Sequence, residues 1–111
     1  MNKREIIEKL LSGEPVLGHK ESGNSMTPLI KHRQPVDLMP VNPELLEKGD
    51  IVLVKVRGKI YLHKVIGLRK DQVQIGNNHG GVNGWTPLDN VYGIVVAVDG
   101  IPRPGALKKV L

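Results

Sequence analysis

The chain has 111 residues, 40% of them hydrophobic and 24% charged, and its 16 basic residues outnumber its 11 acidic residues to give a net charge of +5. This length allows one domain, and this composition is typical of a globular protein. The chain has no cysteine, which excludes disulfides, thiolate metal sites and cysteine nucleophiles. Because it has no run of about 18 apolar residues and a charged N-terminus, we expect no membrane-spanning segment, no secretory signal and a cytoplasmic location.

The first segment, residues 2–12, predicts a short helix. Asn2 and Glu5 have the spacing of a capping box, and Gly13 suits the left-handed position after a helix C-terminus. Two i,i+4 pairs of apolar residues form one stripe along it: Ile6 with Leu10, and Ile7 with Leu11. Since an isolated helix of this length is marginal in water, we expect it to pack on the rest of the chain.

From residue 14 onward, short β-branched runs alternate with glycines and prolines, a pattern typical of an antiparallel β-domain. The predicted strands are 36–41, 50–57, 59–68, 72–75 and 91–98. Arg57-Gly58 predicts a tight hairpin turn, and the polar segment 77–87, with its Asn83-Gly84 turn signal, predicts a loop. The sequence therefore predicts one structural domain, mainly β, made of a short N-terminal helix (1–13), a small β-domain (14–100) and an extended tail (101–111).

One serine and one histidine could carry chemistry. Ser25 lies in a sharp turn, Ser22-Gly23-Asn24-Ser25-Met26-Thr27-Pro28, and such a turn can expose a hydroxyl and aim backbone N–H groups at one point, as an oxyanion site needs. A serine needs a base to become nucleophilic, and a histidine titrates near neutral pH. Strand alternation puts His63 and Lys64 on opposite faces, so only one of them can face Ser25. From the residues alone, a turn serine and a hydrogen-bonded strand histidine are the commoner interpretation.

Four segments, in order, resemble a known superfamily. SGNSMTP resembles the Ser-Met-x-Pro nucleophile box of type I signal peptidases and LexA-type self-cleaving repressors. GDIVLV resembles their Gly-Asp strand, YLHKVIGL the strand that carries their general base, and IGNN with VYGIVVAV their final box. The resemblance covers about residues 21–99 and implies a small antiparallel β-domain of the LexA and signal-peptidase type.

The resemblance implies a role for each matched residue. Ser25 matches the nucleophile. His63 matches the base, which is lysine in most bacterial members and histidine in the endoplasmic-reticulum type. Lys64 matches a neighbouring basic residue, and it becomes the base only if a bulge rotates the strand. The backbone N–H groups from Gly23 to Ser25 are expected to hold the oxyanion, and Met26 is expected to anchor the turn in the core.

The last box departs from the superfamily, because Asn77 stands where histidine-type members place an acid that orients the base. An asparagine can still hold the ring by accepting a hydrogen bond through its amide oxygen. Asp89 and Asp50 are alternative acids. Without a charge beside it, His63 is expected to be a weaker base.

These residues favour a small serine peptidase that needs no cofactor and no metal. The resemblance implies that its substrate is an extended peptide bound as a strand, with small residues before the cut. LexA-type repressors usually cut themselves at an Ala-Gly bond, and this chain contains no Ala-Gly pair, so self-cleavage is not expected. Only 21 residues precede Ser22, which are too few for the DNA-binding unit of such a repressor. The alternative is a catalytically weak or inactive module on the same fold that binds a peptide or forms a homodimer. Nucleic-acid binding ranks last, since the basic residues are scattered and only three residues are aromatic.

Overall fold

The computed structural model describes residues 1–111 and contains one α-helix and eight strands. The elements are helix α1 (Lys3–Leu11) and strands β1 (Val16–His19), β2 (Val36–Met39), β3 (Ile51–Val56), β4 (Lys59–Leu68), β5 (Gln72–Gly76), β6 (Val82–Pro87), β7 (Val91–Val98) and β8 (Ile101–Pro102). Three short 3-10 helices, η1 (Pro43–Leu45), η2 (Leu88–Asn90) and η3 (Ala106–Lys109), complete the chain. The predicted fold class, a mainly β domain with one short N-terminal helix, is confirmed.

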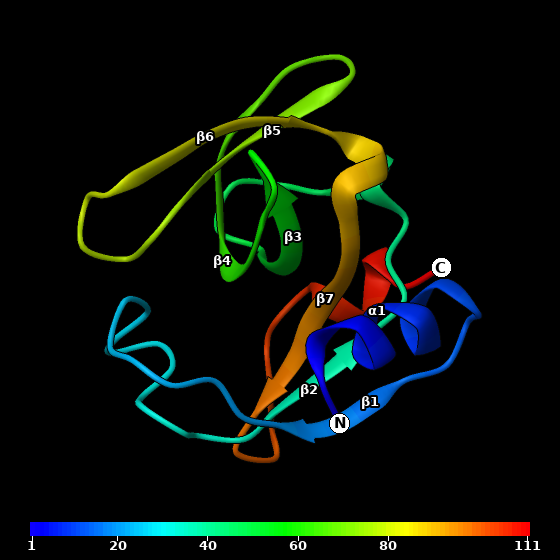
Figure 1. The fold of residues 1–111 in the computed structure, drawn as a ribbon, viewed down its shortest axis with the longest axis vertical. Coiled ribbons are helices and arrows are strands. Elements are labelled where there is room, and N and C mark those ends of the chain that lie inside the picture. Colours follow the sequence, from blue (N-terminus) through cyan, green and yellow to red (C-terminus); the bar gives the residue numbers. More distant parts are fainter.

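All strands belong to one antiparallel sheet with the order β1-β2-β7-β3-β4-β5-β6, and β8 pairs with the end of β7. Strand β7 lies between the two halves of the molecule, with β1 and β2 on one side and the hairpins of β3 to β6 on the other (Figure 1). The second half curls so far that Thr86 on β6 donates its hydroxyl hydrogen to the Lys55 carbonyl on β3 at 2.7 Å. This curl brings β6 back toward the β3–β4 hairpin.

Both faces of the central strands are buried. In β3, Val52, Val54 and Val56 belong to one hydrophobic cluster, whereas Ile51 and Leu53 belong to the other. Two-sided burial explains why β3 reads as a nearly continuous apolar run rather than as an alternating one. The second cluster also contains the residues that fix α1 and the serine turn: Ile6, Leu10, Met26, Ile30 and Leu62.

Several local predictions are confirmed. Strands β4 and β7 begin and end where the sequence placed them. The hairpin turn has positive φ at both Arg57 (51°) and Gly58 (83°), as a two-residue turn that matches strand twist requires. The capping box of Asn2 and Glu5 is formed at the start of α1.

Other local predictions are wrong. Segment 77–87 is not all loop, because Val82–Pro87 forms β6, and the Asn83-Gly84 pair lies inside this strand with Gly84 at φ 129°. Strand β1 was not predicted, since only four residues form it. The tail is not simply extended, because η3 buries Ala106. On α1, Ile6 and Leu10 are buried but Leu11 is exposed, so the apolar stripe is narrower than predicted.

Candidate active site

The structure brings Ser25 and His63 into contact across 38 residues of sequence. The Ser25 Oγ lies 3.1 Å from the His63 Nε2. The residue after Ser25, Met26, is buried in the core, and its carbonyl accepts a hydrogen bond from the Ile30 N–H at 3.0 Å. These contacts fix the position of the serine turn. His63 is only 9% exposed and lies on β4. Met26, expected to anchor the turn, lies in the second hydrophobic cluster.

A third residue, Asn83 on β6, completes a chain of hydrogen bonds. The Asn83 Oδ1 lies 2.7 Å from the His63 Nδ1. An amide oxygen only accepts hydrogen bonds, so the Nδ1 must carry the proton of the neutral ring. The Nε2 then presents its lone pair to the Ser25 hydroxyl, which is the tautomer that a general base needs.

The orientation of β4 separates His63 from Lys64. The β3–β4 pairing runs from Lys59 to Lys64 without a register shift, so the bulge that would turn Lys64 toward Ser25 is absent. The Lys64 Nζ instead donates to the Asn78 Oδ1 at 2.8 Å. On the histidine face, the Tyr61 ring stacks on the His63 ring with centroids 4.9 Å apart. This stacking restricts the ring to the plane in which it reaches Ser25.

The loop after β5 holds the serine turn in place. The Asn78 N–H donates to the Ser25 carbonyl at 2.8 Å, and the Asn78 Nδ2 donates to the Thr27 carbonyl at 2.9 Å. The His79 Nε2 lies 2.9 Å from the Asn24 carbonyl and 2.8 Å from the Thr27 Oγ1. The carbonyl groups of the turn are thus fixed by a loop that the sequence analysis did not connect with them.

Asn77 does not hold the histidine ring. Its Oδ1 accepts hydrogen bonds from the backbone N–H groups of His79 (2.8 Å) and Gly81 (2.9 Å), so it shapes the loop itself. The ring-holding role expected of Asn77 belongs to Asn83. No local signal marks Asn83, because its approach depends on the curl of the sheet, and its segment was predicted as a loop.

The backbone of the turn leaves two N–H donors free. The Gly23 N–H, which was expected to be one of the oxyanion donors, instead donates to the His32 Nδ1 at 2.8 Å. The N–H groups of Asn24 and Ser25 have no acceptor within the chain. A free N–H on Ser25 itself is the kind of donor that can stabilise an oxyanion.

A small cavity of about 20 Å³ opens beside Ser25. Three apolar side chains line it, Met26, Ile30 and Leu62, and charged residues Glu21 and Lys31 stand at its rim. A space of this size holds about one water molecule or a methyl-sized group. It therefore fits a small side chain and excludes a large one.

One backbone edge of the cavity comes from β4. Residues in an antiparallel ladder direct their N–H and C=O groups alternately toward and away from the partner strand. With the two-residue turn at 57–58, Ile60 and Leu62 direct these groups away from β3. Strand β5 pairs with β4 only from Lys64 onward, so this edge is unpaired beside the cavity.

The opposite edge comes from the segment before Ser25. The Glu21 carbonyl accepts from the Arg33 N–H at 2.8 Å, and Gly23 donates to His32. Ser22 lies between Glu21 and Gly23 and also lines the cavity, and neither its N–H nor its C=O group has a partner within the chain. Two unpaired backbone edges therefore flank the cavity at Ser25.

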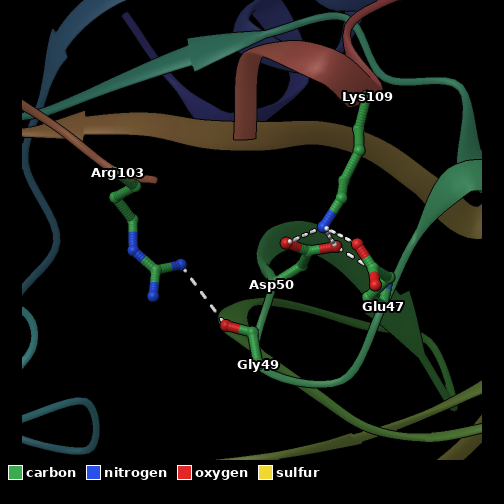
Figure 2. Close-up of polar contacts among 5 residues, drawn as sticks. All are labelled: Glu47, Gly49, Asp50, Arg103 and Lys109. Atoms are coloured by element: carbon green, nitrogen blue, oxygen red, sulfur yellow. Dashed lines mark hydrogen bonds and ion pairs between the residues drawn. The ribbon is translucent and has the colours of Figure 1, made fainter. Parts of the chain in front are cut away.

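Asp50, one of the alternative acids, lies in a different cluster. The Lys109 Nζ on η3 donates to both Asp50 carboxylate oxygens, at 2.7 and 2.8 Å, and lies 3.0 Å from the Glu47 Oε1 (Figure 2). Burial alone would lower the pKa of Lys109, but hydrogen bonds to Asp50 and Glu47 outweigh it and raise the pKa above its usual value. Asp89, the other alternative acid, is exposed and makes no hydrogen bond to His63.

Comparison with protein-family models gives no match for this chain, and comparison with curated protein sequences gives none. Helix α1, the single α-helix, is too short and too polar to cross a membrane. No three His, Asp or Glu side chains come together in a way that could hold a metal ion.

Proposed function

We propose that this chain is a small serine peptidase in which Ser25 is the nucleophile and His63 the general base. The observation that carries the proposal is the chain of contacts from Ser25 Oγ to His63 Nε2 (3.1 Å) and from His63 Nδ1 to Asn83 Oδ1 (2.7 Å). It is the nucleophile–base–orienting group arrangement of covalent catalysis. The ordered sequence boxes that resemble signal peptidases and LexA-type repressors support the same proposal.

The reaction follows from these positions. Ser25 Oγ bonds to the peptide carbonyl carbon while its proton moves to His63 Nε2, and the carbonyl electrons form an oxyanion that accepts a hydrogen bond from the Ser25 N–H. The C–N bond then breaks, and the amine leaves with the proton held by His63. Water attacks the acyl group and gives a proton to His63. That proton restores the Ser25 hydroxyl as the carboxylic acid leaves.

The proposed substrate is an extended peptide that lies as a strand between the unpaired edges of Leu62 and Ser22. Addition of a strand to such edges provides affinity through backbone hydrogen bonds, and pockets for alternate side chains provide specificity. The cavity of about 20 Å³ next to Ser25 supports a preference for alanine or glycine before the cut. This preference agrees with the small residues that the resemblance implies.

Because Asn83 is neutral, His63 is a weaker base than it would be with a carboxylate at that position. In the Ser-His-Asp enzymes of the serine protease type, replacing the aspartate by asparagine costs about 10⁴ in kcat because the wrong tautomer results. Here the amide oxygen accepts from Nδ1, so the productive tautomer is kept and only the stabilising charge is lost. We expect slow but measurable turnover.

Cleavage can be tested without knowing the substrate. The purified protein is incubated with a proteome-derived peptide library, and new N-termini are counted by mass spectrometry. We expect cuts after small residues that vanish with Ser25→Ala and with His63→Ala. Equal patterns for the native protein and both variants would refute the peptidase. A cytoplasmic location belongs to the same proposal and is tested by cell fractionation.

The second candidate function is a peptide-binding or self-associating module on the same fold. The observation that favours it is the absence of a carboxylate on His63, whose Nδ1 meets an amide. Such a module keeps its partner when Ser25 becomes alanine, and it yields no new N-termini. Co-purification with the Ser25→Ala variant, compared with the native protein, separates the two functions, and sedimentation shows whether the partner is a second copy.

A further inference from the structure

Lys3, in the first turn of α1, links the two edges that flank the cavity. The Lys3 Nζ donates to the Ile60 carbonyl on β4 at 3.4 Å and lies 3.4 Å from the Glu21 Oε1. Glu21 stands at the rim of the cavity beside Ser25. The ammonium group therefore bridges the gap between β4 and the segment that leads into the serine turn.

The carboxylate that attracts Lys3 is held in its charged form. The His19 Nε2 lies 3.0 Å from the Glu21 Oε2. This hydrogen bond from His19 lowers the pKa of Glu21; burial opposes the shift and Lys3 reinforces it. The ion pair between Lys3 and Glu21 is thus present at neutral pH, and the sequence analysis gave Lys3 no such role.

The Ile60 carbonyl is also a group that an extended peptide would use. A strand that pairs with Leu62 beside Ser25 reaches Ile60 two residues farther along, about 7 Å away. The Ile60 carbonyl faces away from β3, as its contact with Lys3 shows. A peptide long enough to reach Ile60 therefore competes with Lys3 for one acceptor.

We propose that Lys3 is a specificity-determining residue that closes the far end of the peptide groove and disfavours peptides long enough to reach Ile60. This inference rests on the proposed peptidase function. Lys3 and Glu21 are 47% and 24% exposed in their side chains, so the barrier is modest. Ion pairs of this kind correspond to roughly a two- to fivefold effect and weaken as salt rises.

Two phosphonate probes of different length test this. Acetyl-alanine diphenyl phosphonate reaches only Ser25 and the cavity, whereas the tetraalanine analogue extends past Ile60. In both, Ser25 Oγ bonds to phosphorus, its proton goes to His63, and phenoxide leaves. The second-order labelling rates are measured by intact mass for the native protein, for Lys3→Met and for Arg4→Met. Arg4 lies next to Lys3 and pairs only with Glu8 on the same helix, so its variant is the matched control.

We expect Lys3→Met to label about two to five times faster than the native protein with the long probe and at the native rate with the short probe. Arg4→Met should match the native protein with both. Higher salt should speed the long probe for the native protein and leave Lys3→Met unchanged. If the long probe reacts equally or more slowly with Lys3→Met, Lys3 is no barrier, while short-probe labelling still upholds the peptidase. If neither probe labels Ser25, the proposed function is refuted and this inference with it.

Discussion

Two polar clusters in this molecule contrast in charge. At the Asp50–Lys109 cluster, a carboxylate and an ammonium group, each 8% exposed as residues, pair at 2.7 Å. At the Ser25–His63 cluster, a hydroxyl, a ring and the Asn83 amide are linked without any carboxylate. The acid that could have served as a third catalytic group is thus used to hold the C-terminal η3 against the sheet.

The contrast shows what each cluster is suited to do. Full charges buried together gain little net stability, but losing one partner leaves the other charge buried and unpaired. Such a pair fixes one arrangement of chain segments that are 59 residues apart. At the neutral cluster no ion pair has to be broken before His63 takes the proton of Ser25. The Asp50 cluster is therefore structural, and the Ser25 cluster is the one suited to chemistry.

The largest expected effect is on activity at the neutral cluster. Ser25→Ala or His63→Ala should lower the cleavage rate by on the order of 10⁴-fold or more, because nucleophile and base act as one unit. Thermal melting should change little in Ser25→Ala, since the hydroxyl is half-buried and not part of the core. His63→Ala should melt at a lower temperature, since it removes a ring that is only 9% exposed. Peptide cleavage and melting are measured together, with Ser12→Ala, at the residue that follows α1, as the control. Cleavage that survives either substitution would show that this cluster does not carry out the reaction.

The next largest effect is on stability at the charged cluster. Lys109→Met should lower the free energy of unfolding by about 3–5 kcal/mol, because the Asp50 carboxylate stays buried without a cation and keeps only the Glu47 N–H as a donor. Adding Asp50→Asn should recover much of this loss. Denaturant unfolding measures both, and Lys108→Met, an exposed neighbour on η3, is the matched control. Equal unfolding midpoints for Lys109→Met and Lys108→Met would contradict the structural role of the pair.

The third prediction concerns a substitution that places a negative charge in the neutral cluster. Asn83→Asp should raise kcat/KM by about tenfold, since a charged hydrogen bond to the ring is about 1–1.5 kcal/mol stronger than a neutral one. Its carboxylate favours the imidazolium, so the acidic limb of the pH–rate profile should move to higher pH. Asn83→Ala should lower kcat/KM by about tenfold. A profile that does not move in Asn83→Asp would show that Asn83 does not act on His63.

The smallest effect is a pH dependence confined to the charged cluster. The pKa of Lys109 is raised above its usual 10.5, so the pair contributes fully below this pH and its contribution is lost as pH rises through the higher folded value. The free energy of unfolding of the native protein should therefore fall above about pH 10.5 more steeply than that of Lys109→Met. Parallel curves for the two proteins would mean that Lys109 does not titrate with unfolding.

The sequence predicts the local features and misses those set by the curl of the sheet. Alternation along β4 was enough to show that only one of His63 and Lys64 can face Ser25, and the resemblance to the superfamily pointed to His63. The residues around the 57–58 turn were enough to place the hairpin. Asn83 was not predictable, since it reaches His63 only because β6 curls back toward the β3–β4 hairpin. The pairing of Asp50 with Lys109 was missed for a related reason, because no local pattern links residues 59 positions apart.

The most direct test of the central claim, that His63 activates Ser25, is labelling with diisopropyl fluorophosphate followed by intact mass measurement and peptide mapping. We predict one adduct on the native protein, located on Ser25, and a rate that falls to background in His63→Ala while that variant remains folded. No adduct on the folded native protein, or an equal rate in His63→Ala, would contradict the claim.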